Sequence, residues 1–438
     1  MSDIHIFTAQ YVLPVSAPVV SPGAVAIGVG SGETVIVAVD TPEALRARFP
    51  AAGVRDFGEA AILPGLVNTH THLELTALRG RLENLGFHEW IAALVRYKRE
   101  QMTEADLLES ARAGCREAMR AGVTTVADTA EAMTTLPAMI ESGLRGVLYQ
   151  ECFGPAAEQA TAALDGLQQK LETHRRTLDA AGATLRIRLG VSPHAPYSVS
   201  PIFYRRLAGY AQTEKLDMAL HIAESAAETA LLRDGTGPFA DRLRNRGIAW
   251  TAPGCSPIAY LERLGVLDNA PLLIHCVAVE GEDITAIAAS RSRVAHCPKS
   301  NAKLGHGIAP LDTMRYAGIH VGLGSDSVAS NNTCDMLEEA RFAGLAQRAA
   351  MRDARVLPPD DLLRLMTIDG ARALGLDHLT GSLEPGRQAD LIAIDLSAPH
   401  LRPHEDPVAA VTQSASGRDV IFTMAAGRVL YDAAAGVT

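Results

Sequence analysis

Short apolar runs alternate with longer amphipathic segments through the middle of the chain. The amphipathic segments, such as 106–121 and 335–349, carry apolar residues at helical spacing. Eight apolar runs have the length of strands and span 62–70, 123–128, 146–151, 185–191, 218–223, 271–275, 293–296 and 320–324. Eight strand–helix units over roughly 310 residues predict a (β/α)8 barrel, because this alternation is typical of a parallel sheet covered by helices.

The two ends of the chain have a different pattern. Their β-rich runs are separated by turns that contain Pro and Gly, and they span 4–7, 24–28, 34–39, 390–394 and 420–424. We therefore expect an α/β fold in which a distorted TIM barrel carries a small β-sandwich built from both termini. The predicted units are residues 1–61 and 375–438 for the sandwich and 62–374 for the barrel.

Composition narrows the function classes. The chain has 438 residues with 40 Lys or Arg and 50 Asp or Glu, a formal net charge of −10, which argues against a nucleic-acid partner. No apolar run reaches the roughly 18 residues that a transmembrane helix needs, so no membrane partner is expected. The start of the chain lacks the basic-then-apolar pattern of a secretion signal, which predicts a cytoplasmic location. Six scattered cysteines without a CxxC pair favour reduced thiols.

Ionisable side chains stand at the carboxyl ends of several predicted strands. His70 and His72 end the first strand, His221 lies near the end of the fifth, and Asp326 follows the eighth. Barrels of this type place their active sites at that end. Residues two apart on a strand point the same way, so His70 and His72 present two imidazoles on one side.

These four residues predict a metal site. An isolated HxH pair is often accidental, but His221 and Asp326 at equivalent depth complete a set of three imidazoles and one carboxylate. That set suits zinc, with ferrous iron as the alternative, and leaves a position for water. None of the five lysines ends the fourth predicted strand, so a second metal bridged by a modified lysine is not expected. We predict one divalent metal.

Three further residues stand near this set. Glu224 lies three residues beyond His221, where a carboxylate beside a metal can exchange protons with a substrate. His275 ends the sixth predicted strand and is interpreted as a group that orients the attacking water, the alternative being a hydrogen-bonded core histidine. For His296 the structural and the functional interpretation both stay open.

The motifs around these residues resemble the amidohydrolase superfamily, in its branch of cytosine/adenosine-type deaminases and chlorohydrolases. They span 63–72, 192–198, 221–225, 296–301, 322–327 and 386–391, so the resemblance covers essentially the whole chain. It implies a distorted barrel with a β-sandwich formed by both termini, in agreement with the strand pattern. It also implies a metal-dependent hydrolase that acts on a small molecule, and homodimers are common in the family.

Within this branch, segments 71–75, 78–80 and 87–90 are most similar to the aminodeoxyfutalosine deaminases of menaquinone synthesis. Deaminases of S-adenosylhomocysteine and methylthioadenosine usually carry a ribose-holding glutamate where Arg99 stands here. The basic cluster 96–100 would suit a substrate with an anionic tail, and a solvated helix face is the alternative. The resemblance also implies substrate contacts for Trp90, His194 and Glu74, although Glu74 could instead form a salt bridge at the rim.

The resemblance implies hydrolytic deamination at C6 of an aminopurine nucleoside. The first candidate is 6-amino-6-deoxyfutalosine; S-adenosylhomocysteine, methylthioadenosine and adenosine are alternatives. Glu224 would protonate N1 of the purine, His275 would steady the water, and Asp326 would take a proton with its second oxygen and return it to the departing amine. Two other functions stay open, a chlorohydrolase-type hydrolase that displaces a ring substituent, and a metal-free binding or assembly protein on the same scaffold.

Overall fold

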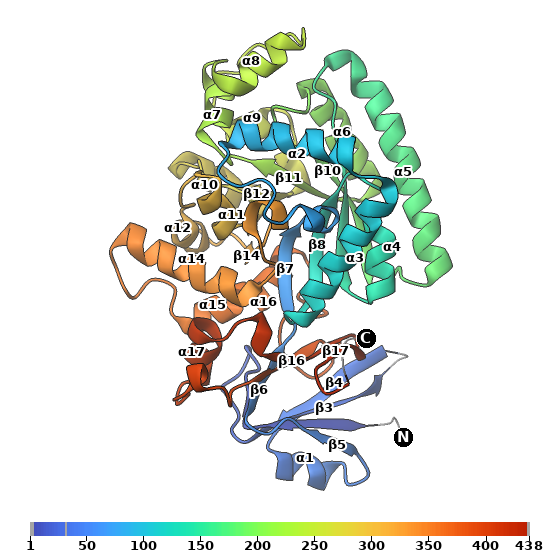
Figure 1. Ribbon diagram of the computed structural model, residues 1–438, viewed down its shortest axis with the longest axis vertical. Coiled ribbons are helices and arrows are strands. Elements are labelled where there is room, and N and C mark those ends of the chain that lie inside the picture. Colours follow the sequence, from blue (N-terminus) through green and yellow to red (C-terminus); the bar gives the residue numbers. More distant parts are fainter. Residues whose placement is uncertain (1–3, 31–32, 436–438) are drawn as a thin grey trace.

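Eight parallel strands form a barrel at the centre of the larger part of the molecule (Figure 1). The computed structural model describes residues 4–30 and 33–435; residues 1–3, on which the expectation about a secretion signal partly depends, lie outside that part. The barrel strands pair in chain order and are β7 (Leu66–Thr71), β8 (Val123–Ala130), β9 (Arg145–Cys152), β10 (Ile187–Pro193), β11 (Asp217–Ile222), β12 (Leu272–His275), β13 (Arg293–His296) and β14 (Val321–Leu323). The predicted barrel is confirmed.

The first and last barrel strands meet through the segment that carries Asp326. The Asp326 backbone N–H donates to the His70 carbonyl over 2.9 Å, and Thr71 forms a parallel bridge with Asp326. This contact brings the carboxyl ends of β7 and β14 together at the rim of the barrel. His70 and Asp326, which are far apart in the sequence, therefore lie next to each other.

Helices cover the outside of the barrel and its rim. Their bounds are α1 (Pro42–Arg48), α2 (Phe87–Gln101), α3 (Glu104–Arg120), α4 (Thr135–Ser142), α5 (Ala160–Ala181), α6 (Pro201–Glu214), α7 (Ala226–Arg233), α8 (Gly237–Asn245), α9 (Pro257–Arg263), α10 (Gly281–Ala289), α11 (Pro298–Lys303), α12 (Leu311–Tyr316), α13 (Val328–Asn331), α14 (Met336–Met351), α15 (Pro359–Leu365), α16 (Ile368–Ala373) and α17 (Pro407–Ala409). The predicted helices 106–121 and 335–349 are α3 and α14. Side-chain caps begin both: Thr103 accepts from the Asp106 N–H, and Asp335 accepts from the Leu337 N–H.

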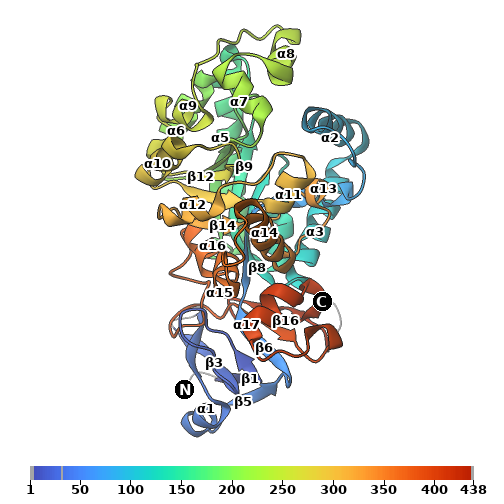
Figure 2. The same cartoon turned by 90° about the vertical axis from the view of Figure 1, so that its left-hand side faces the viewer.

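Two sheets from the chain termini lie below the barrel in Figures 1 and 2. The first has the order β4-β3-β1-β5 and the second β17-β16-β15-β6-β2. Their bounds are β1 (His5–Ala9), β2 (Tyr11–Val12), β3 (Gly23–Gly30), β4 (Glu33–Asp40), β5 (Gly53–Asp56), β6 (Ala60–Pro64), β15 (Leu391–Asp395), β16 (Val420–Ala425) and β17 (Arg428–Asp432). A shared apolar core joins them; in it the rings of Phe7 and Phe422 are 5.6 Å apart. The prediction that both termini contribute to these sheets is confirmed.

The predicted strand over 62–70 is wrong at its start. The chain there forms two strands, because β6 pairs with β15 of the terminal sheet, whereas β7 begins at Leu66 and pairs with β8 of the barrel. Gly65 makes the transition, and a Cβ at this position would lie 2.2 Å from Thr124 Oγ1. We therefore propose Gly65 as the boundary in place of residue 62; the boundary between 374 and 375 stays a prediction.

A buried ion pair between Arg145 and Asp390 connects the terminal sheet to the barrel. Arg145 begins β9 and donates from Nε and from a terminal nitrogen to the two carboxylate oxygens of Asp390, over 3.0 and 2.9 Å. The side chains are 1% and 0% exposed. Asp390 belongs to the motif at 386–391, so the motif has a structural role here, since a buried charge requires a partner in good geometry.

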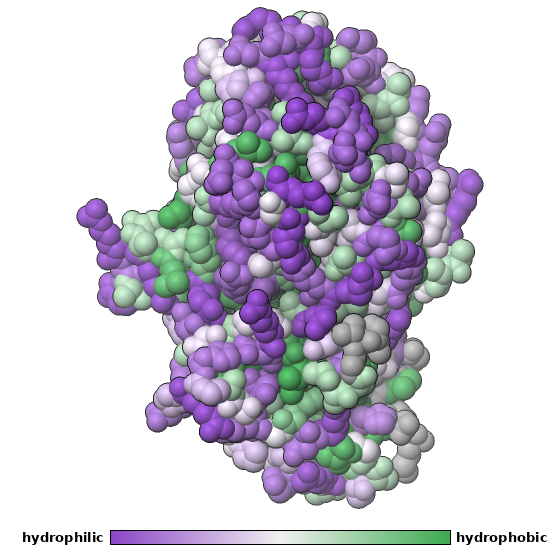
Figure 3. All heavy atoms as spheres, in the orientation of Figure 1, coloured by the Kyte–Doolittle hydropathy of each residue, from purple (hydrophilic) through white to green (hydrophobic). Residues whose placement is uncertain are grey.

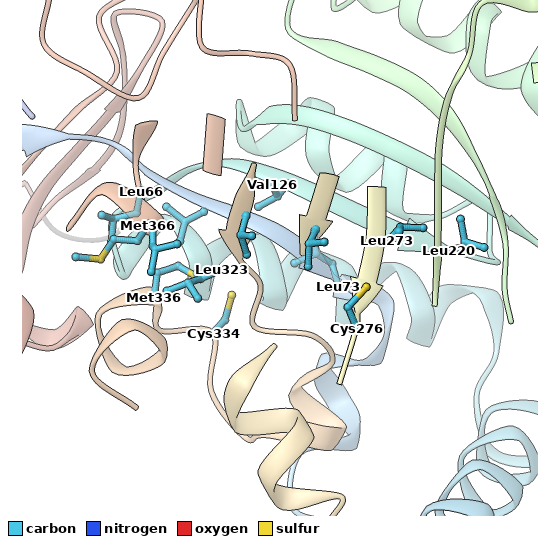
Figure 4. Close-up of a cluster of buried hydrophobic side chains, with 14 of the residues drawn as sticks. Leu66, Leu73, Val126, Leu220, Leu273, Cys276, Leu323, Cys334, Met336 and Met366 are labelled. Atoms are coloured by element: carbon cyan, nitrogen blue, oxygen red, sulfur yellow. The ribbon is translucent and has the colours of Figure 1, made fainter. Parts of the chain in front are cut away.

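Apolar side chains from many elements fill the space between the barrel strands and the surrounding helices. Figure 4 shows part of this core, with Leu66, Val126, Leu220, Leu273 and Leu323 extending from five barrel strands. On the face seen in Figure 3 polar residues predominate and apolar ones are scattered. Within residues 4–30 and 33–435, no helix has both the length and the apolar character that crossing a bilayer requires.

Candidate active site

Unusual backbone conformations occur where three strands reach the rim. Ala223, His275 and Asp326 have φ values of 50°, 77° and 56°, in the left-handed region that residues with a Cβ rarely adopt. Hydrogen bonds hold two of these turns: the Asp326 N–H donates to His70, and the Ala223 N–H donates to the Glu228 carboxylate over 2.9 Å. Strained backbone of this kind is often found at functional sites, which directs attention to this rim.

The four predicted metal ligands lie together at the rim. His70 Nε2 is 3.2 Å from Asp326 Oδ1, and His72 Nε2 is 3.6 Å from the same oxygen. His72 Nε2 is also 3.3 Å from His221 Nε2, and the His70 and His221 rings are 5.0 Å apart. The donor atoms form two overlapping groups, each within 4.8 Å, of which one joins His70, His72 and Asp326 and the other joins His70, His221 and His275.

The protonation of these imidazoles makes the set suitable for a cation. Burial lowers the pKa of His70, lowers that of His72 to about 3, and lowers that of His221 well below its ordinary value, so all three are neutral at pH 7. His221 Nδ1 donates to the His194 carbonyl over 3.2 Å, which leaves the Nε2 lone pair free. Because His70 Nε2 has no hydrogen-bond partner, the residues fit one divalent cation such as Zn²⁺ or Fe²⁺.

The two oxygens of Asp326 have different surroundings. Oδ1 faces the imidazoles, while Oδ2 accepts hydrogen bonds from Ser300 Oγ and Ser330 Oγ over 2.6 and 2.9 Å. Both lone pairs of Oδ2 are therefore engaged. The expectation that this second oxygen takes the proton of the attacking water stays a prediction.

Glu224 lies beside His275, which is itself held by Asn301. His275 Nε2 is 3.5 Å from Glu224 Oε1, and His275 Nδ1 donates to Asn301 Oδ1 over 2.9 Å. The Glu228 carboxylate accepts the Glu224 backbone N–H over 3.0 Å, which fixes the turn that carries Glu224. The Glu224 carboxylate is therefore buried, oriented and open toward the cavity that it lines.

His306 is a site residue that the sequence analysis missed. Its Nε2 lies 3.4 Å from Glu224 Oε1, its side chain is 3% exposed, and its ring contacts the Phe87 ring at 4.4 Å. His275 and His306 thus approach the same oxygen of Glu224 from two elements. Since His306 follows α11 in a segment without strand or helix periodicity, no pattern in the sequence places it near Glu224.

We expect His306→Phe to lower kcat by roughly tenfold, a part of the 10²- to 10⁴-fold that a positioned general acid contributes, because it removes the ring nitrogen that lies 3.4 Å from Glu224 Oε1. His306→Gln, which keeps an N–H donor, should retain most of the activity. The pH profile of kcat, measured for both variants, distinguishes a positioning role from a packing role. Equal losses in the two variants with an unchanged profile would contradict the contact with Glu224.

A cavity of about 330 Å³ opens onto the ligand set. A single face of α2 forms one wall, because Phe87, Trp90, Ile91, Leu94, Val95 and Lys98 recur at helical spacing and all line the cavity. The predicted substrate contacts Glu74, Trp90 and His194 line it as well. An apolar wall with a few polar groups near a reactive centre is typical of a small-molecule site.

The prediction that Arg99 binds substrate is wrong in position. Arg99 has a side chain that is 77% exposed and pairs with Glu100 over 3.3 Å, outside the cavity. Lys98, one residue earlier, lies on the cavity face of α2 and forms ion pairs with Glu74 and Glu131. Glu74 therefore combines the two interpretations left open, since it lines the cavity and also forms a salt bridge.

Two further buried residues, Glu151 and His296, bear on the predictions about the site. Glu151, in β9, lines the cavity and has an oxygen 4.0 Å from His221 Nδ1; burial raises its pKa well above the ordinary value. Its place at the carboxyl end of a strand could have identified it by the rule that selected the ligands. His296 is buried but does not line the cavity, and burial lowers its pKa to about 3, which favours the structural interpretation.

Comparisons with known proteins find relatives along most of the chain. The model of the amidohydrolase family matches residues 61–430. A protein of Moorella thermoacetica named 5-methylthioadenosine/S-adenosylhomocysteine deaminase is 33% identical over 420 residues, which cover 96% of this chain and 92% of the relative. The family match covers the whole barrel, and the match to the Moorella protein covers nearly the whole chain.

Solved structures of two deaminases are also similar to this chain. A zinc-bound adenosine deaminase from Xanthomonas campestris superposes with a TM-score of 0.83 and 28% identity, covering 98% of this chain and 92% of the other. An aminofutalosine deaminase from Helicobacter pylori superposes with a TM-score of 0.78, covering 97% and 99% of the two chains. Its 19% identity shows a shared fold alone.

Proposed function

Because the chain belongs to the amidohydrolase family and is a hydrolytic deaminase, we propose that it releases ammonia from C6 of an aminopurine nucleoside. The observation that carries this proposal is the convergence of His70, His72, His221 and Asp326 beside the cavity carboxylate Glu224. We propose that these four residues hold one divalent cation, zinc in the first instance and ferrous iron as the alternative. A cation in such a site lowers the pKa of a water to near neutrality.

In this proposal the residues of the chain divide the proton transfers. Asp326 accepts a proton from the attacking water and later returns it to the departing amine, while Ser300 and Ser330 hold its Oδ2. Glu224 protonates N1 of the purine, which neutralises the negative charge that attack at C6 builds on the ring, and it regains a proton from the C6 hydroxyl when the C6 carbonyl forms. His275, held by Asn301, keeps the water in line with C6.

The nucleoside that we propose first is 6-amino-6-deoxyfutalosine, which would connect the protein to menaquinone synthesis. The apolar wall of α2 supports it, since Trp90, Ile91 and Leu94 provide a surface for an aryl substituent. 5-Methylthioadenosine and S-adenosylhomocysteine are the second candidates, because the Moorella relative carries their names. Adenosine is a third, from the name of the Xanthomonas structure.

The proposal also covers the cellular location of the enzyme, its partners and the competing functions. We propose a cytoplasmic location and a small-molecule substrate without a nucleic-acid or membrane partner, in line with the acidic balance of the chain. A homodimer stays a prediction. A chlorohydrolase-type displacement is the competing reaction at the same site, and a metal-free binding protein is the competing function.

The proposed function is tested by incubating the metal-loaded protein with 6-amino-6-deoxyfutalosine, S-adenosylhomocysteine, 5-methylthioadenosine and adenosine, and by measuring released ammonia. We expect turnover of at least one of the four nucleosides. A chlorinated and an alkylamino-substituted triazine in the same panel test the competing reaction through chloride and alkylamine. Release of these without ammonia from any nucleoside would contradict the proposal.

A further inference from the structure

We propose that Arg242, on α8, and Arg246, the residue that follows the end of α8, form a subsite for a carboxylate at the far end of the substrate's substituent. The inference rests on the proposed function and deepens it, because it assigns the substrate class: a nucleoside whose substituent has an apolar body and ends in an anion. Helix α8 lies at the end of the molecule opposite the terminal sheets, above the barrel in Figures 1 and 2. Both arginines line the cavity that opens onto the ligand set.

The packing of α8 explains why these two side chains are directed to the cavity. Phe239 and Arg242 are three residues apart, so they lie on one face of α8, and Arg246 directly follows the last turn of the helix. Phe239 stacks on the Tyr197 ring at 3.9 Å with an interplanar angle of 3°, and it meets the Phe87 ring edge-on at 6.0 Å. Because Phe87 and Tyr197 line the cavity, the face that continues into Arg242 and Arg246 borders it too.

The two guanidinium groups have no charged partner in the part of the chain that the structure describes. Among the described residues, neither guanidinium group makes a hydrogen bond or an ion pair with another side chain. Arg244, on another face of α8, pairs with Asp241 over 2.7 Å. Two cavity carboxylates, Glu74 and Glu131, already pair with Lys98. Two arginines four residues apart in the sequence therefore present unpaired donors to the cavity.

Guanidinium groups bind carboxylates through paired, charge-assisted hydrogen bonds. The wall of α2 adjoining α8 contributes the apolar residues Trp90, Ile91 and Leu94, which would contact the body of the substituent. An aryl carboxylate matches both features. A neutral substituent such as a methylthio group would use the apolar wall and leave the two arginines without a partner.

The test compares substrates that do and do not carry the carboxylate. We would measure kcat/KM for 6-amino-6-deoxyfutalosine and S-adenosylhomocysteine, which are charged, and for 5-methylthioadenosine and adenosine, which are neutral. The variants are Arg242→Gln, Arg246→Gln, the double variant and the matched control Arg244→Gln. For the double variant we expect the ratio of kcat/KM for 6-amino-6-deoxyfutalosine over adenosine to fall roughly 10- to 100-fold, mainly through KM. Arg244→Gln should leave the ratio unchanged.

The outcomes separate this inference from the proposed function. Equal losses with charged and neutral nucleosides in the double variant would overturn the inference, and so would an unchanged ratio, while deamination of adenosine would leave the proposed function intact. A ratio that falls equally in Arg244→Gln would show a general effect of net charge and would also overturn it. Absence of ammonia from all four nucleosides in the unmodified protein would overturn both.

Discussion

Glu224→Gln should lower kcat by roughly 10³-fold, since a positioned general acid contributes about 10²–10⁴-fold to a reaction rate. The amide occupies the space of the carboxylate but cannot deliver a proton to N1 of the purine. In residues 4–30 and 33–435 the ion pairs of the Glu224 side chain join it to His275 and His306, and no ion pair or hydrogen bond joins it to one of the four proposed ligands, so the cation should stay bound. Steady-state ammonia release and metal content, measured on the same sample, test both halves of this expectation.

A matched control is Glu214→Gln, which makes the same chemical change at a half-exposed residue that pairs with Arg175. This variant should keep its full activity. If Glu224→Gln keeps more than about a tenth of kcat, which is above the range expected for loss of a general acid, Glu224 is not the proton donor. If Glu224→Gln also loses the cation, the residue contributes to metal binding and its assignment has to change.

His72→Ala should remove both the cation and the activity. The side chain brings Nε2 within 3.6 Å of Asp326 and 3.3 Å of His221, so its loss leaves an incomplete set of three donors. We expect the metal content to fall to a small fraction of one ion per chain and kcat to fall by roughly 10³-fold or more, because the activated water is lost with the ion. Elemental analysis of protein dialysed against metal-free buffer gives the first quantity.

His320→Ala provides the comparison, because His320 is exposed and lies outside the cavity. It should bind metal and release ammonia as the unmodified protein does. Retention of a full equivalent of metal by His72→Ala would show that the ligand set is wrong, even if the activity were lost.

The ligand set could be predicted from sequence because two simple rules apply to it. His70 and His72 alternate on a strand, and His221 and Asp326 lie near the carboxyl ends of their strands, an end that all eight strands of a barrel share. The barrel and the terminal sheets followed from strand and helix periodicity. The register of the first strand did not, because β6 and β7 form one continuous apolar run in the sequence and only the pairing partners separate them.

Residues on the remaining elements could not be placed in this way. His306 comes from a loop, and its distance to Glu224 depends on how that loop packs against Phe87. Lys98 and Arg99 are neighbours in a basic run, and only the rotation of α2 decides that Lys98 lines the cavity and Arg99 does not. Such features arise from tertiary packing, which a periodic pattern in one sequence does not encode.

The most direct test of the central claim is a titration of the metal-depleted protein with Zn²⁺, followed by release of ammonia from an aminopurine nucleoside. If His70, His72, His221 and Asp326 hold one catalytic cation, activity should rise from near zero and reach its plateau at about one equivalent per chain. Full deaminase activity in the depleted protein, or a plateau only at two equivalents, would contradict the account.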